Sequence, residues 1–163
     1  MTRRMQRRAR GFFGIGVWHP KQGANVGTLW RHANLYEAQF IFTIGARYRH
    51  QCTDTTKAEL SIPLYEHDDL ASFEGNLPRR AEIVCVELTD KAKPLDEFVH
   101  PEQAVYLLGA EDHGLPDWIL HGRRCVQIAS PGHSSMNVST AGTLVMYDRY
   151  VKTTQFRRLK ESA

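Results

Sequence analysis

The chain has 163 residues, 42% of them hydrophobic, which is enough to build the core of one compact domain. It contains neither a membrane-spanning run of roughly eighteen apolar residues nor an apolar signal-peptide segment, so we expect a cytoplasmic protein with no membrane partner. Cys52, Cys85 and Cys125 lie far apart without metal-ligand spacing, which argues against disulfides and against a bound metal.

The net charge of +3 is unevenly distributed along the chain. Residues 1–10 contain five arginines and no acid, and residues 151–163 contain four basic residues against one acid. Such segments can contact phosphates by releasing counterions, which favours a nucleic-acid partner, although a solvated tail that aids solubility would have the same composition. We expect a basic arm over 1–10, a single domain over 11–156 and a basic tail over 157–163.

The first third of the chain is predicted to form a strand, a loop, a helix and a second strand. Residues 12–17 form an apolar strand, and a glycine-containing loop follows over 19–27. Apolar residues then recur at helical spacing over 28–38, where Thr28 can serve as N-cap. A second strand is expected over 39–44. The loop therefore leads into a helix N-terminus, where backbone amides can meet an anion.

The rest of the chain continues this alternation. A strand is expected over 81–88, with an apolar run that suggests burial on both faces. The other expected elements are a short helix over 68–73, a strand over 104–108, a helix over 117–120, a strand over 125–128 and a closing helix over 138–156. Alternating strands and helices predict an α/β fold with a mostly parallel sheet flanked by helices.

Polar loops follow several of the predicted strands. In open α/β sheets ligands bind beyond the carboxyl ends of the strands. The loops over 19–27, 109–116 and 130–137 are therefore expected to form the walls of one site.

These three loops resemble the motifs of the SPOUT methyltransferases, specifically the SpoU or TrmH-like branch that modifies tRNA and rRNA riboses. The first motif is Asn-x-Gly at Asn25, with Arg31 six residues later; the second is Gly-x-Glu-x-x-Gly-Leu over 109–115; the third is Ser-x-Asn-x-Ser over 135–139. The resemblance covers residues 11–150. It implies a deep C-terminal trefoil knot and a homodimer with the active site at the subunit interface.

The resemblance also implies an activity and a cofactor. The activity is transfer of a methyl group from S-adenosylmethionine to an RNA ribose 2′-hydroxyl, which leaves S-adenosylhomocysteine and needs no metal. The adenosine requires a narrow, largely apolar slot. Cofactor contacts implied by the resemblance are Leu88, Gly109, Ile128 and Ser135, and Leu108 and Met136 supply further apolar walls.

Catalysis is assigned by the resemblance to Arg31, Asn25, Glu111, Ser135 and Asn137. A guanidinium, with a pKa above about 12, is a reluctant base, so we favour Arg31 as a clamp that holds a phosphate and stabilises the developing alkoxide, with deprotonation left open. The two asparagines can orient loops or the ribose, and Glu111 is expected to pin its loop by accepting hydrogen bonds. Ser135 either binds the cofactor or caps the closing helix.

The substrate is the least determined part of the prediction. We favour tRNA, with rRNA as the nearest alternative, and a catalytically silent RNA-binding module on the same fold as an alternative from another class. Candidate RNA contacts are Arg3, Arg4, Arg7, Arg8, Arg10 and Lys21. His113 and His133 are either further contacts or plain polar loop residues. Gly132 to Met136 lacks the final glycine of a hydrolase nucleophile elbow, which disfavours a hydrolase.

Overall fold

The computed structural model describes residues 11–48, 61–132 and 135–161, without the side chains of 154–161. The arginines of the basic arm, Cys52 and His133 lie outside the described residues. Within those residues, none of the helices has the length and apolar character needed to cross a membrane.

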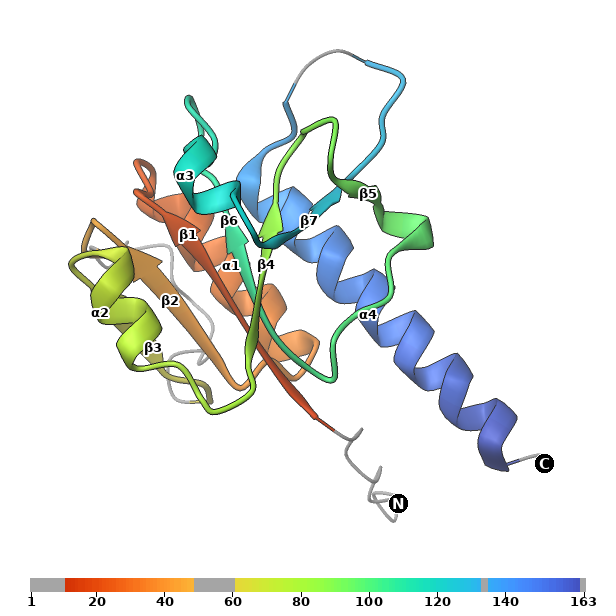
Figure 1. Cartoon of the computed structure of the whole chain (residues 1–163). Helices are drawn as coiled ribbons and strands as arrows, with labels where there is room; N and C mark the ends of the chain where they lie inside the picture. Colours follow the sequence, from red (N-terminus) through yellow and green to blue (C-terminus); the bar gives the residue numbers. More distant parts are fainter. Residues whose placement is uncertain (1–10, 49–60, 133–134, 162–163) are drawn as a thin grey trace.

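A seven-stranded sheet forms the centre of the described fold, and every strand pair in it is parallel (Figure 1). The spatial order of the strands is β3-β2-β1-β6-β4-β7-β5. Their bounds are β1 (Phe12–Trp18), β2 (Phe40–Ile44), β3 (Leu64–His67), β4 (Glu82–Val86), β5 (Lys93–Pro94), β6 (Gln103–Leu108) and β7 (Arg124–Gln127). The expected α/β fold with a mostly parallel sheet is confirmed.

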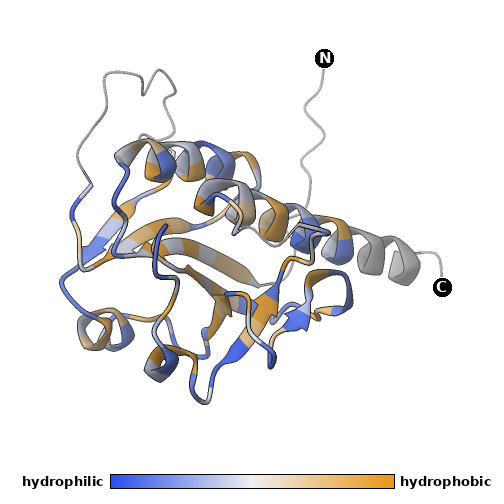
Figure 2. Ribbon diagram, turned by 90° about the horizontal axis from the view of Figure 1, so that it is seen from above, coloured by the Kyte–Doolittle hydropathy of each residue, from blue (hydrophilic) through white to orange (hydrophobic). Residues whose placement is uncertain are grey.

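Helices cover both faces of the sheet (Figure 2). The long helices α1 (Gly23–Leu35) and α4 (Val138–Glu161) pack together on one face, and the short helices α2 (Leu70–Gly75) and α3 (Asp117–Leu120) lie on the other. A short 3-10 turn, η2, spans Leu95–Glu97. Leu29 and Met146 are buried in the core under α1 and α4, whereas Phe73 and Ile119 are buried in the core under α2 and α3. The two cores sandwich the sheet.

Two strands were not expected from the sequence. β3 has four residues with only partial burial, and β5 has two. Both lie at edges of the sheet. They are too short to show a strand pattern in the sequence, and pairing with one neighbouring strand defines them. The predicted strand over 81–88 ends at Val86, and Leu88 is 56% exposed rather than buried.

The predicted start of α1 is wrong. The helix begins at Gly23, with Gln22 in the N-cap position, so Thr28 lies inside the helix and cannot be its N-cap. The side chain of Gln22 makes no capping hydrogen bond; a carboxylate from a distant loop accepts from backbone N–H groups just before the helix, as described below. At its far end α4 continues to Glu161, beyond the expected 156, so part of the segment expected as a tail is helical.

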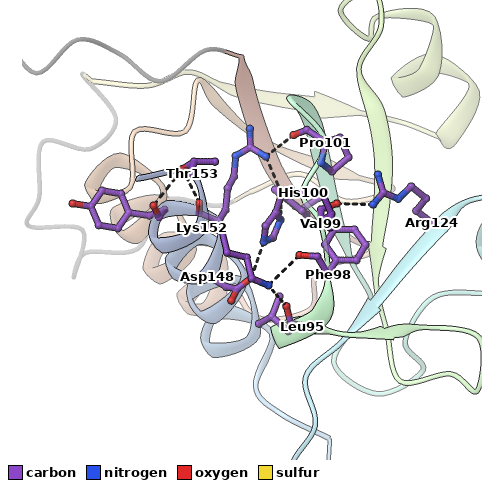
Figure 3. A network of polar contacts seen from close by, with 12 residues as sticks. Leu95, Phe98, Val99, His100, Pro101, Arg124, Asp148, Lys152 and Thr153 are labelled. Carbon is purple, nitrogen blue, oxygen red and sulfur yellow. Dashed lines mark hydrogen bonds and ion pairs between the residues drawn. The ribbon is translucent and has the colours of Figure 1, made fainter. Parts of the chain in front are cut away.

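A buried polar network fastens α4 to the segment before β6 (Figure 3). Arg149 Nη1 donates to the Tyr106 hydroxyl oxygen at 3.2 Å, and His100 Nδ1 lies 2.6 Å from the same oxygen. Because a guanidinium can only donate, the tyrosine proton is left for His100 Nδ1. His100 is then neutral and donates from Nε2 to Asp148 Oδ2 at 2.8 Å, and Lys152 Nζ lies 2.7 Å from that carboxylate.

Burial lowers the pKa of His100 to about 4. The hydrogen bond and the charge of Asp148 oppose that shift, while the cations of Arg149 and Lys152 add to it. The neutral imidazole is therefore the stable form over the physiological pH range. The network also satisfies backbone carbonyls, since Arg149 donates to Pro101 O at 2.7 Å. It fixes the middle of α4 against the segment that precedes β6.

Candidate functional site

A pocket opens beyond the carboxyl ends of β4, β6 and β7, where the expected loops converge. Val86 and Val138 form part of its wall, so it lies between the end of β4 and the start of α4. All six residues expected to contact the cofactor line this one pocket: Leu88, Leu108, Gly109, Ile128, Ser135 and Met136. Their sequence positions span three separate segments, and the fold brings them together.

The walls of the pocket combine exposed apolar side chains with polar groups. Leu88 and Met136 are 56% and 37% exposed, which leaves their apolar surface available to a ligand. The hydroxyls of Ser130 and Ser135 and the carboxylate of Glu87 border the same space. An apolar slot with a few polar groups at its edge suits a nucleoside-like ligand.

Gly109 and Gly114 allow the loop after β6 to fold tightly back on itself. A bridge joins Ala110 to Gly114, and Gly114 has φ +63°, a conformation that favours glycine. A Cβ placed on Gly109 would lie 2.5 Å from the backbone carbon of Gly114 and 2.7 Å from Glu87 Oε2. The close approach therefore requires glycine at position 109.

Glu87 holds two walls of the pocket and was not predicted as a site residue. Its Oε2 accepts from the backbone N–H of Leu115 at 2.7 Å, and its Oε1 accepts from the N–H of Leu88 at 3.0 Å. The side chain therefore ties the loop after β4 to the loop after β6. The sequence signal that could have identified Glu87 is its position, because it is an acidic residue directly after the apolar run of a buried strand.

A chain of hydrogen bonds links Glu111, Asn25 and Asn137, one residue from each predicted motif. Asn25 Nδ2 donates to Glu111 Oε1 at 3.0 Å, and Asn137 Nδ2 donates to Asn25 Oδ1 at 3.0 Å. Glu111 also accepts from the backbone N–H groups of Lys21 at 3.1 Å and Gln22 at 3.2 Å. These are backbone hydrogen bonds of the kind expected for Glu111, and they lie just before the first turn of α1.

Glu111 is an ionised carboxylate at a helix N-terminus. Burial alone would raise its pKa, but hydrogen bonds from the Asn25 amide and from backbone N–H groups outweigh burial and lower the pKa. Its negative charge also lies at the positive end of the α1 dipole. The anion that the sequence suggested for this helix N-terminus is thus supplied by the chain itself.

Asn137 caps α4. Its Oδ1 accepts from the N–H of Ser139 at 3.0 Å, from the hydroxyl of Ser139 at 2.7 Å and from the N–H of Thr140 at 3.3 Å. The sequence left open whether Ser135 caps α4 or binds the cofactor; the residue that caps α4 is Asn137. Ser135 lies on the pocket wall.

Arg31 is exposed and lies on α1, away from the pocket wall that the described residues form. With α1 starting at Gly23, Arg31 lies six helical positions after Asn25, which places the two side chains about 120° apart around the axis and about 9 Å apart along it. The exposed Arg31 therefore leaves the helix in a different direction from the buried Asn25.

Lys21 and His113 both lie beside Asp112. The Lys21 ammonium forms an ion pair with Asp112, and His113 Nε2 is 3.2 Å from the same carboxylate. The hydrogen bond from Lys21 lowers the pKa of Asp112. Lys21 would exchange this partner for a phosphate if it contacts RNA.

A model of the SpoU rRNA methylase family matches residues 13–147 of the chain. The match includes every site segment from β1 to the middle of α4. No curated protein sequence matches.

Several solved structures share the fold. A structure described as giving structural insights into the 2-OH methylation of C/U34 on tRNA is 24% identical with a TM-score of 0.77, over 90% of this chain and 99% of that chain. The SpoU methyltransferase AviRb from Streptomyces viridochromogenes, in complex with the cofactor AdoMet, is 20% identical with a TM-score of 0.75, over 93% and 64%. The TrmH/SpoU tRNA modifying enzyme of A. aeolicus is 17% identical with a TM-score of 0.75, over 90% and 79%.

Proposed function

Because this chain belongs to the SpoU rRNA methylase family, we propose that it transfers the methyl group of S-adenosylmethionine to a ribose 2′-hydroxyl of RNA, with tRNA as the favoured substrate. The observation that carries the proposal is the convergence of six expected cofactor residues on one pocket beside the Glu111, Asn25 and Asn137 chain. The tRNA preference draws support from the structure described for 2-OH methylation of C/U34 on tRNA, which has nearly the same extent as this chain.

The residues of the pocket fit S-adenosylmethionine. Leu88, Leu108, Ile128 and Met136 would enclose the adenine, and the hydroxyl of Ser135 would hold a polar edge of the cofactor. When bound, this cofactor supplies an electrophilic methyl group on a sulfonium. Glu87 and Gly109 shape the pocket because they keep the loop after β4 close to the loop after β6.

The chain's own residues would position the acceptor. A ribose hydroxyl reacts poorly until its developing negative charge is stabilised in line with the methyl donor. Arg31 provides a fork of donors for the phosphate next to that ribose and for the alkoxide. Asn25 is held on both sides by Glu111 and Asn137, so its role is to fix the start of α1.

We infer that Arg31 serves the pocket of a partner subunit in a homodimer. Arg31 does not line the pocket of its own chain among the described residues. The outer surface of α1 and α4 carries exposed apolar side chains: Leu35, Leu144, Tyr147 and Tyr150. Tyr36 packs against both tyrosines, with ring centroids 6.4 Å and 6.3 Å away, which makes the patch continuous across the two helices. A patch of this kind marks a protein interface.

We also propose the C-terminal trefoil knot for this chain. Its support is the path of the final segment, which leaves β7, contributes Ser135 and Met136 to the pocket and returns to α1 through the Asn137 to Asn25 hydrogen bond. Met136 and Val138 line the pocket together with Val86 at the end of β4 and Leu108 at the end of β6, so the start of α4 lies over the ends of these strands, as the proposed knot requires.

The proposal is tested with the full chain, radiolabelled S-adenosylmethionine and separate tRNA and rRNA fractions from a strain that lacks the gene. Label is expected in tRNA, in dinucleotides that resist alkaline cleavage because their 2′-hydroxyl is methylated. Label in rRNA would identify the alternative substrate. Absence of cofactor binding in calorimetry, together with retained RNA binding, would instead identify a catalytically silent RNA-binding module. Label in a base would overturn the proposed ribose chemistry.

A further inference from the structure

Three aromatic side chains, Trp18, His19 and Trp118, form a cluster that the proposed methyl transfer does not use. The ring centroids of Trp18 and Trp118 are 5.8 Å apart with their planes at 81°, and those of Trp18 and His19 are 4.5 Å apart. Trp18 is half-buried, whereas Trp118 is 59% exposed. The edge of one indole thus supports the other, whose surface remains available to solvent.

The cluster borders the loops that build the site. Trp18 ends β1 and is followed within a few residues by Lys21, whose backbone N–H binds Glu111. Trp118 lies on α3, three residues after Leu115, whose N–H binds Glu87. Figure 1 shows the end of β1 and α3 at the same edge of the sheet as these loops. An RNA whose ribose enters the pocket would have this edge within reach of its neighbouring nucleotides.

Trp118 is not needed to pack α3. Ile119 is fully buried and anchors the helix, and its carbonyl accepts from Arg123 Nη1 at 2.5 Å. Trp118 leaves a large indole in solvent on the same short helix. Together with the half-buried Trp18 it makes an aromatic surface, and tryptophan is enriched where proteins bind other molecules.

His19 is held rigidly in the cluster. It has φ +44°, its N–H donates to Ile44 O at 2.7 Å, and its ring lies so close to Gly45 that a Cβ there would be 2.2 Å from Nε2. A non-glycine residue persists in this backbone region only when its surroundings impose it. The cluster is therefore preorganised rather than assembled on binding.

We propose that Trp18, His19 and Trp118 form a stacking platform for an unpaired base of the RNA substrate, adjacent to the methylated nucleotide. This inference rests on the proposed function. Sequence-specific RNA recognition targets bases that are splayed out of single-stranded loops and stacked on aromatic side chains. Every base has a π-face, so the platform provides affinity and places the strand, while the pocket decides which ribose reacts.

The test compares Trp118→Ala with the parent in binding to a short oligouridylate and to the same ribose phosphate chain without bases. Loss of one stacked base predicts that Trp118→Ala binds oligouridylate about 5- to 150-fold more weakly. Trp118→Phe keeps an aromatic ring and should lose much less. The parent and Trp118→Ala should bind the chain without bases equally. Val99→Ala, which trims another exposed apolar side chain, should change neither affinity.

Several results would overturn the platform. They are unchanged oligouridylate affinity in Trp118→Ala, an equal loss with the abasic chain, or a change in molar mass by light scattering without a change in RNA affinity, which would identify a protein interface. Cofactor calorimetry and thermal unfolding of each variant report separately on the pocket and the fold. A chain that binds oligouridylate through Trp118 but transfers no methyl group would keep the platform and refute the proposed function.

Discussion

The side-chain amide of Asn137 donates to Asn25 Oδ1 at 3.0 Å and so joins the residue that caps α4 to the first turn of α1 across 112 positions of sequence. The same Asn137 side chain caps α4 through its oxygen. One residue therefore both starts the final helix and attaches it to the helix that carries Arg31.

The two functions of Asn137 are separable by substitution. Asn137→Ala should lower the free energy of unfolding by about 1 kcal/mol, because the cap is lost. Asn137→Ser keeps a capping hydroxyl and should be more stable than Asn137→Ala, measured by urea unfolding. Both variants lose the bond to Asn25, so both should bind S-adenosylmethionine more weakly in calorimetry. Parent-like binding by Asn137→Ser would show that the link is dispensable.

Gly109→Ala should impair cofactor binding. Its Cβ would lie 2.5 Å from the backbone of Gly114, so the loop after β6 must shift away from the pocket. Gly132→Ala is a matched control, because a Cβ there meets no atom within 4 Å. Calorimetry should show a weaker cofactor only for Gly109→Ala. Equal affinities in the two variants would mean that this loop does not shape the cofactor site.

Arg31→Ala should abolish methyl transfer to RNA while leaving cofactor affinity within about tenfold, or roughly 1.4 kcal/mol, because the proposed role of the guanidinium is to hold the RNA phosphate and the alkoxide rather than the cofactor. Arg31→Lys keeps the charge without the planar fork and should recover little activity. The measurement is transfer of label to the RNA fraction that the parent modifies. Full activity in Arg31→Ala would remove this residue from the mechanism.

Stability should depend on pH through His100. Its pKa is about 4 in the folded chain, against 6.5 for an unperturbed imidazole, so the unfolded chain binds the extra proton between these values. The neutral His100 therefore adds to the free energy of unfolding above pH 6.5, and this stabilisation is lost as the pH falls towards 4. The loss is at most about 3 kcal/mol. His100→Gln should remove this slope. Urea unfolding of both proteins from pH 7 to 5 gives the comparison, and parallel curves would contradict the assignment.

Deletion of residues 2–10 should weaken RNA binding and flatten its dependence on salt. Those residues contribute five arginines, and each phosphate contact that is lost removes counterion release from the binding reaction. Titrations at several salt concentrations provide the slope. An unchanged slope would identify the arm as a solvated tail, the interpretation that its composition equally allows.

Sequence patterns predicted the architecture and part of the pocket wall. Alternating apolar strands and helices are local signals, and they correctly predicted a parallel α/β sheet with loops gathered at one edge. The second and third motifs contain three of the six expected cofactor residues, Gly109, Ser135 and Met136, and the other three lie at or just beyond the ends of predicted strands.

Tertiary contacts decided the features that local signals could not carry. α1 starts at Gly23, and Glu111, about ninety positions away, holds the residues just before it by accepting the N–H groups of Lys21 and Gln22. That earlier start turns Arg31 away from Asn25. Glu87 became a site residue only when the fold brought Leu115 to its carboxylate. Periodicity and spacing report on neighbours along the chain, whereas a hydrogen bond to a distant loop depends on where the sheet has placed both partners.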